Sequence, residues 1–300
     1  MQCLTVSPSQ VAAAALAGAA LTLSVAAQAT PEAGQTQTVV FPNAATLDGS
    51  ILQRSPLTWT TADGNGAIED YLVSYGDVGG VTSVGPLKSA GGGTVFGFPG
   101  DIVRVGVDYY GVDSTLRFLY TVNLATAICT KVNNAYSSAY TTVYSLAYDA
   151  PHDRLFAVDL AHKQLLLFNR ATGYPMPIGT GTLSGYPQVR SLAYRAANDR
   201  LYAVDQSTSM LLHMNPTTGA VTPVVTVTPL PNARMEELEF WGEDLYGMLG
   251  GLSSGVLVNA QLVHIDLISG AIEFVGPQVP NCSPHSLVLS SVPESSRWSQ

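Results

Sequence analysis

Five different polar residues occupy similar places in successive copies of a repeated unit, and their side chains together could form a binding or catalytic site. They are Asp101, Tyr144, Arg190, Glu236 and His285. The last four align directly before an apolar run, and Asp101 is a looser equivalent. Carboxylates and an imidazole can coordinate a cation or act as an acid–base pair, and a mixed polar group can bind a sugar. The alternative is structural. Arg190 and Glu236 would form a salt bridge, and the other side chains would line a water-filled channel.

The repeat is clearest in residues 144–173 and 190–219, which match without a gap. Ser145 corresponds to Ser191, 46 positions later. Each copy contains short apolar runs that end at Asp, Asn, Gly or Pro, which is typical of strands. Four strands in about 46 residues indicate one blade of a β-propeller. The start of a blade's first strand lies near one mouth of the central channel, so the five polar residues are predicted to surround that mouth.

A shorter phrase, an apolar strand followed by a polar turn, occurs five times in residues 71–276. The turn positions are Gly80, Ala127, Gly173, Gly219 and Gly270. Glycine suits such a turn because it adopts positive φ without a steric cost. Five phrases predict at least five four-stranded blades, with six as the alternative. Asp159 and Asp205 also recur at one place, and we predict that they cap turns.

The ends of the chain predict how the propeller closes. Residues 286–290 repeat the first strand of the unit, whereas the N-terminal region has later strands without that first one. We therefore expect the C-terminal strand to pair with the N-terminal strands in a shared blade, which removes free sheet edges. The propeller is predicted over residues 57–291, between a lead-in with extra strands at 30–56 and a disordered tail at 292–300.

Residues 1–29 are predicted to be a signal peptide. An uncharged run at residues 11–27 is followed by an A-x-A cleavage motif that ends at Ala29; a membrane anchor is the alternative. The prediction is export to the periplasm or the extracellular space, with no membrane span once the signal is removed. Such a compartment permits a disulfide between Cys129 and Cys282, although the sequence does not show whether they come within bridging distance.

Composition and motifs exclude several functions. The chain is 12% charged with a formal net charge of −9, which argues against nucleic acid and against an anionic membrane surface. Residues 251–255 match G-x-S-x-G, but apolar runs on both sides indicate a hairpin loop rather than a nucleophile elbow. No nucleotide or dinucleotide motif is present. We expect no cofactor, and a divalent cation at the channel mouth is the one exception left open.

The repeated phrase L-[YFL]-x-[VI]-[ND]-x-x-T-G, with S-L-A-Y and L-Y-A-V-D before it, resembles a known repeat. It is similar to that of bacterial exported β-propellers of the surface-layer and NHL-like types. The likeness covers residues 71–290 and is sharpest over 144–219. This resemblance implies a propeller fold and often ligand or partner binding, without specifying an activity.

We therefore expect an exported, monomeric β-propeller that is not an enzyme and recognises an extracellular protein or glycan through a face of loops. The first alternative is a hydrolase or lyase that acts on a polysaccharide or lactone. Glu236 and Asp101 would then be its carboxylates at the channel mouth. The second alternative is a structural envelope protein without a discrete ligand.

Overall fold

The computed structural model describes residues 57–62, 70–75, 81–89, 99–132, 136, 139–140, 142–180, 182–228, 233–253, 256–280, 283–284 and 287–289. They belong to one compact unit, Thr36–Gln300. In these ranges the regular elements are strands, apart from one short 3₁₀ helix at Ala196–Asn198. Within the same ranges, no helix has the length and apolarity needed to cross a membrane.

Each of the two clearest repeats forms one four-stranded antiparallel sheet, and we name each sheet after its first strand. The β9 sheet contains β9 (Val143–Asp149), β10 (Arg154–Asp159), β11 (Gln164–Asn169) and β12 (Tyr174–Ile178). The β13 sheet contains β13 (Ala193–Arg195), β14 (Arg200–Asp205), β15 (Met210–Met214) and β16 (Val221–Thr226). The strands coincide with the apolar runs of the sequence, and neighbours in the chain are neighbours in the sheet.

Two further sheets follow the same plan. The β17 sheet contains β17 (Ala233–Trp241), β18 (Asp244–Ser253), β19 (Val256–Ile265) and β20 (Ile272–Pro280). The β5 sheet contains β5 (Pro99–Val105), β6 (Asp108–Asp113), β7 (Phe118–Asn123) and β8 (Ile128–Lys131), with β4 (Lys88–Ser89) parallel to β8. Ser253 of β18 pairs with Val256 of β19, which agrees with the interpretation of residues 251–255 as a hairpin loop.

The remaining sheet joins the two ends of the described chain. It contains β1 (Leu57–Ala62), β2 (Asp70–Tyr75) and β3 (Val81–Pro86), with β21 (Ser283–Pro284) and β22 (Val288–Leu289) both antiparallel to β1. This β1 sheet contacts β5 on one side and the β17 sheet on the other. The predicted signal peptide, lead-in and tail lie outside the described residues.

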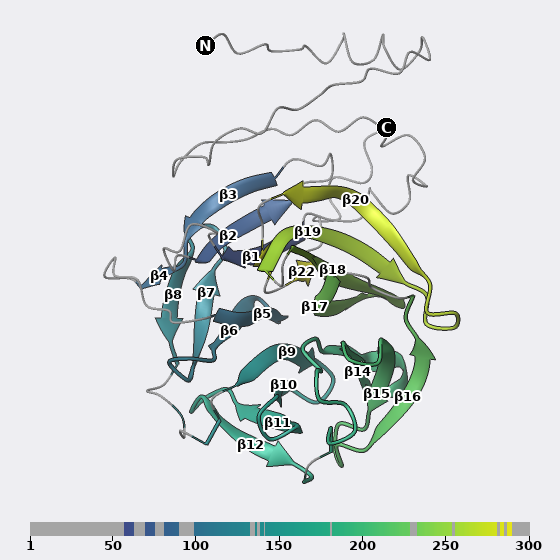
Figure 1. Ribbon diagram of the computed structural model, residues 1–300. Helices are drawn as coiled ribbons and strands as arrows, with labels where there is room; N and C mark the ends of the chain where they lie inside the picture. The colour runs from purple at the N-terminus through teal and green to yellow at the C-terminus, as the bar shows by residue number, and fades with distance from the viewer. Residues whose placement is uncertain are drawn as a thin grey trace, which may run out of the picture. The chain divides into compact units, whose positions relative to one another are not determined.

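The arrangement is an all-β, β-propeller fold (Figure 1). Figure 1 shows β5, β9 and β17 on the inner side of their sheets and β12, β16 and β20 on the outer side. Apolar side chains fill the space between neighbouring sheets; for example, Phe156 and Leu165 belong to the same buried cluster as Leu201 and Leu212. Burying each such side chain contributes about 1.5–3 kcal/mol. Burial on both faces explains why the strands are nearly continuous in apolarity.

The predicted turn chemistry is confirmed at the positions that the structure describes. Ala127, Gly173, Gly219 and Gly270 all have positive φ, between 55° and 72°; Gly80 lies outside the described residues. Asp159 accepts a hydrogen bond from the Ala161 N–H at 3.0 Å, and Asp205 accepts one from the Thr208 N–H at 3.0 Å. Both aspartates therefore cap the turn after the second strand of their sheet, as the repeat predicts.

Candidate functional site

Tyr144, Arg190 and Glu236 lie in or shortly before the first strands of three consecutive sheets. Tyr144 is in β9, Arg190 lies shortly before β13, and Glu236 is in β17. Arg190 lies over Tyr144, with its guanidinium carbon 5.1 Å from the centroid of the ring. This cation–π contact joins the β9 and β13 sheets, and it pairs two residues that the repeat alignment predicts at one mouth of the channel.

Glu236 has a buried carboxyl oxygen that lacks a hydrogen-bond partner in the described part of the chain. The residue is 8% exposed, and its Oε1 has no hydrogen-bond partner among the described residues. Burial raises the pKa of the carboxyl group, while the positive charges of Arg190 and Arg234 lower it. A buried oxygen without a donor costs about 1–3 kcal/mol, so this position favours a ligand that supplies a donor.

The salt bridge that was the structural alternative for this trio does not form in the described part of the chain. Arg190 influences Glu236 only through its charge, and its direct contact is with the ring of Tyr144. The guanidinium group of Arg190 and the carboxyl oxygen of Glu236 are therefore not hydrogen-bonded to each other. A ligand that both accepts and donates hydrogen bonds could contact both.

Asp101 belongs to a different layer from the other predicted residues. It precedes the buried Ile102 of β5 in the same way that Ser145 precedes Leu146 in β9. Its equivalents in the repeat are therefore the three residues that directly follow the mouth positions, Ser145, Ser191 and Glu237. The looser equivalence predicted for Asp101 differs from the structure by one residue. Asp101 of β5 and Glu237 of β17 each follow a β-bulge, so Asp101 is equivalent to Glu237 and not to Glu236.

Both oxygens of Asp101 accept hydrogen bonds from backbone N–H groups. Oδ1 accepts one from Ile102 at 2.6 Å, within β5, and Oδ2 accepts one from Leu146 at 2.5 Å, in β9. The residue is 1% exposed. Asp101 is therefore held in the interior by two neighbouring sheets, and the structure does not present it to a polysaccharide at the surface.

Glu237 is the partner of Asp101 at the centre. The residue is 1% exposed, and its Oε1 accepts hydrogen bonds from the Ser145 hydroxyl at 2.9 Å and the backbone N–H groups of Leu192 at 3.2 Å and Leu238 at 2.8 Å. Its Oε2 has no donor partner among the described residues. The Glu237 side chain thus connects the β9, β13 and β17 sheets.

Consecutive residues of β9 hold the two carboxyl groups as neighbours, since Ser145 donates to Glu237 and Leu146 donates to Asp101. Burial raises the pKa of Asp101 to about 7, opposed by the hydrogen bonds that it accepts. Burial also raises the pKa of Glu237 well above its usual range, and the charge of Asp101 raises it further. The sign of these shifts means that the pair holds protons more tightly than free carboxylic acids do.

Sequence reasoning missed Glu237, although the repeat contained the signal. Ser145, Ser191 and Glu237 are spaced by 46 positions, so a carboxylate replaces serine at one copy of a single repeat position. The mouth residues come from the preceding position, where all four copies differ. A comparison at this second position would have selected Glu237 as the copy with different chemistry.

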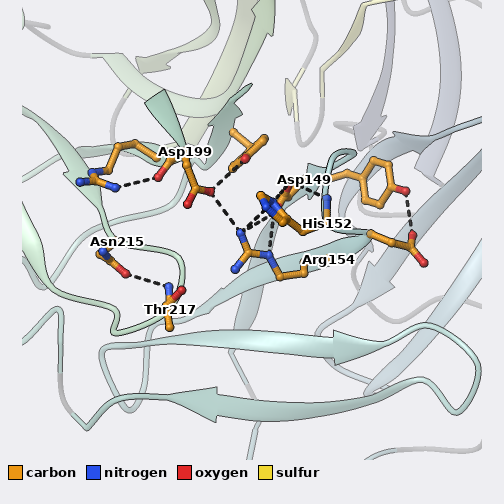
Figure 2. Close-up of polar contacts among 10 residues, drawn as sticks. Asp149, His152, Arg154, Asp199, Asn215 and Thr217 are labelled. Carbon is orange, nitrogen blue, oxygen red and sulfur yellow. Dashed lines mark hydrogen bonds and ion pairs between the residues drawn. The ribbon is translucent and has the colours of Figure 1, made fainter. Parts of the chain in front are cut away.

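The opposite end of β9 carries a group with metal-ligand chemistry, namely Asp149, His152 and Asp199. Figure 2 shows Arg154 between the two aspartates. Its guanidinium lies 2.5 Å from Asp149 and 3.1 Å from Asp199, and His152 Nδ1 lies 3.0 Å from Asp149. The arginine already supplies the positive charge that a metal ion would bring. These residues therefore form an ion-pair network that links the β9 and β13 sheets, and they fit a metal site less well.

Two predicted residues lie outside the described part of the chain. These are His285, the fifth member of the mouth set, and Cys282, the proposed disulfide partner of Cys129. Cys129 is buried in β8, and burial raises the pKa of its thiol to about 12. The disulfide and the contribution of His285 stay predictions.

Comparisons with known proteins support the fold and assign no family. No family model and no curated protein match the chain. A chain of a nidogen–laminin complex has a TM-score of 0.51 at 13% identity, over 78% of this chain and 80% of that one. A structural-genomics protein from Bacteroides thetaiotaomicron has a TM-score of 0.44 at 17% identity, over 76% of this chain and 59% of that one. At such identities the nidogen–laminin similarity shows the fold alone, and it agrees with the β-propeller that the sheets form.

Proposed function

We propose that this protein is an exported β-propeller that binds an extracellular glycan at the channel mouth formed by Tyr144, Arg190 and Glu236. The observation that carries the proposal is the buried Oε1 of Glu236, which has no donor partner among the described residues. A sugar hydroxyl can donate to that oxygen, and other sugar oxygens can accept from Arg190. His285 completes the mouth in this proposal, and an extracellular protein is the alternative partner.

The rest of the proposal follows the sequence. Each of the five described sheets is taken as one blade, and pairing of β21 and β22 with β1 closes the propeller. Residues 1–29 direct export, and the mature chain acts as a monomer without a bound cofactor. Such a scaffold supports recognition because it presents many loops on a rigid frame.

The geometry gives less support to the hydrolase or lyase alternative. Glycosidases need two carboxylates that reach the scissile bond from defined separations. Asp101 is 1% exposed, and both of its oxygens accept backbone hydrogen bonds. An acid–base role for Asp101 at a polysaccharide would require this network to break first.

The test is binding of soluble neutral and amino-sugar oligosaccharides to residues 30–300, measured by thermal shift and by calorimetry, with and without EDTA. A ligand at about a hundred times its Kd should stabilise the protein by about 2.7 kcal/mol. We expect Glu236→Gln and Arg190→Met to abolish the response. Arg195→Met is the matched control, because Arg195 pairs with Glu243 on the β13 and β17 sheets and lies outside the mouth.

Four results would contradict the proposal. Binding that survives both mouth substitutions would place the site elsewhere. Release of new reducing ends would favour the enzyme, and stabilisation that EDTA removes would add a divalent cation. No response to any sugar would favour a protein partner or a structural role.

A further inference from the structure

The pair formed by Asp101 and Glu237 connects sheets that are not neighbours in the ring. Asp101 is in the β5 sheet and Glu237 is in the β17 sheet, with the β9 and β13 sheets between them on one side and the β1 sheet on the other. Figure 1 shows β5 and β17 on the inner side of their sheets. Ser145 donates to Glu237 while the next residue, Leu146, donates to Asp101. The two carboxyl groups therefore meet at the centre.

Donors from four sheets converge on this pair. They are the backbone N–H groups of Ile102, Leu146, Leu192 and Leu238 and the hydroxyl group of Ser145. Each N–H belongs to the residue that follows the same repeat position, in or just before the first strand of its sheet. The β5, β9, β13 and β17 sheets therefore direct equivalent donors toward one point. In a buried place these N–H groups must have acceptors, and the two carboxyl groups supply them.

Among the described residues, no arginine or lysine forms an ion pair with Asp101 or Glu237. The pKa shifts of Asp101 and Glu237 arise from burial, from each other and from hydrogen bonds, with no cationic side chain among the causes. Arg190 and Arg234 act on the neighbouring Glu236 instead. Two ionised carboxylates in contact would repel each other strongly in such a setting, and one proton between them removes that repulsion.

We infer that Asp101 and Glu237 share one proton at neutral pH, and that this proton locks the first strands of four sheets around the centre. In the lock, one carboxyl group donates its O–H to an oxygen of the other, which stays ionised and keeps accepting the N–H groups. When a base removes the proton, no donor remains between the two groups and both carry negative charge. Raising the pH therefore loosens the centre of the propeller.

A metal ion is a weaker interpretation of the same residues. A calcium ion takes six to eight oxygen ligands, whereas both oxygens of Asp101 and the Oε1 of Glu237 already face N–H or O–H donors. These donors point their positive ends at the carboxyl groups, which opposes a cation in that position. Among the described residues only Glu237 Oε2 of this pair lacks a donor, and the proton shared with Asp101 satisfies that oxygen.

The direction of the pH effect follows from the raised pKa values. In the unfolded chain both groups ionise near pH 4, whereas in the folded protein the pair still holds its shared proton at about pH 7. Between these limits the folded state binds more protons, so stability is highest at the acid end of this window and decreases as the pH rises. Over two pH units the loss corresponds to a fall in Tm of about 5 °C.

The test is the Tm of the full chain between pH 5 and pH 9 for the wild type, Glu237→Gln and Glu273→Gln. The amide of Glu237→Gln reproduces the protonated carboxyl group, since Oε1 can accept the same three donors and Nε2 can donate to Asp101. We expect the decrease of Tm with pH to shrink by about 5 °C in Glu237→Gln and to persist in Glu273→Gln, whose carboxylate is exposed in the same sheet.

A second measurement keeps the inference testable if a substitution perturbs folding. Infrared difference spectra of the wild type between pH 6 and pH 9 should show the loss of a protonated-carboxyl band, and Asp101→Asn should lack this change. An unchanged pH slope in Glu237→Gln, or no such band in the wild type, would overturn the inference. So would a rise in Tm with Ca²⁺ or Mg²⁺ that Glu237→Gln abolishes, because the pair would then hold a metal ion.

Discussion

Buried carboxylates at the two ends of the first strands have different partners. At the end of β9, Asp149 is fully buried and its Oδ2 lies 2.5 Å from the guanidinium of Arg154. At the start of the strands, Asp101 and Glu237 are almost as buried, but N–H and O–H groups surround them instead of a cationic side chain. Arginine neutralises charge at one end, and protons or ligand donors must do so at the other.

Within one repeat, carboxylates paired with arginine lie at one end of the first strand and carboxylates without such a partner lie at the other. The arginines at the C-terminal ends of the first strands link neighbouring sheets. Arg154 contacts Asp199, and Arg195 contacts Glu243. A carboxylate with such a partner is committed to the fold. At the start of the strands, one carboxyl oxygen of Glu236 and one of Glu237 have no hydrogen-bond partner within the described part of the chain. That end can therefore bind a ligand or a proton without breaking an ion pair.

Removing an arginine-paired carboxylate should have the largest effect on stability. Asp149→Ala leaves Arg154 without its buried partner and removes the acceptor of the His152 N–H. We expect the free energy of unfolding to fall by about 3 kcal/mol, measured by urea denaturation. Asp153→Ala is the matched control, because Asp153 is exposed in its pair with Arg170. A similar loss in both variants would mean that burial does not decide the strength of these pairs.

A close approach between sheets gives the next largest effect. Gly270 has φ of 72°, and an added Cβ would lie 2.1 Å from the carbonyl oxygen of Thr226 in β16. Gly270→Ala should therefore destabilise by about 2 kcal/mol, from backbone strain and overpacking together. Gly106→Ala has a similar φ and open space around it, so about 1 kcal/mol is expected. Equal losses in thermal denaturation would show that the β16 contact yields easily.

The turn chemistry and the mouth position could be predicted from the sequence because they repeat. Gly173 and Gly219 mark equivalent turns, and Asp159 and Asp205 cap equivalent hairpins, since each copy must solve the same local problem. The fold class follows from the same periodicity. Such features depend on residues close in the chain, where spacing alone predicts contact.

The central pair could not be predicted in this way, because closure of the propeller brings it together. Asp101 and Glu237 are in separate repeats, and neither repeat shows that its carboxyl group will face another. The one-residue difference for Asp101 follows from the strand pairing, in which Asp101 of β5 and Glu237 of β17 both follow a bulge. A bulge is not visible in a pattern of apolar positions. The role of Arg190 also depends on side-chain geometry, which placed it over Tyr144.

The smallest expected effect concerns Glu236 and Arg190. No ion pair joins them within the described ranges, and Arg190 acts on Glu236 through its charge alone. In the ligand-free protein, a double-mutant cycle of Glu236→Gln and Arg190→Met should therefore give a coupling of about 0.5 kcal/mol. The raised pKa of Glu236 gives the sign of its single effect: the folded state resists ionisation, so Glu236→Gln gains stability relative to the wild type as the pH rises above 5.

Urea denaturation at pH 5 and pH 8 measures both quantities. A coupling near 3 kcal/mol, as expected for a directly paired buried carboxylate, would restore the Arg190–Glu236 salt bridge as the correct interpretation. The mouth would then resemble the Asp149 end of the strand, with its charges committed to the fold. A small coupling leaves both groups able to contact a ligand, and this is the condition that the glycan-binding proposal requires.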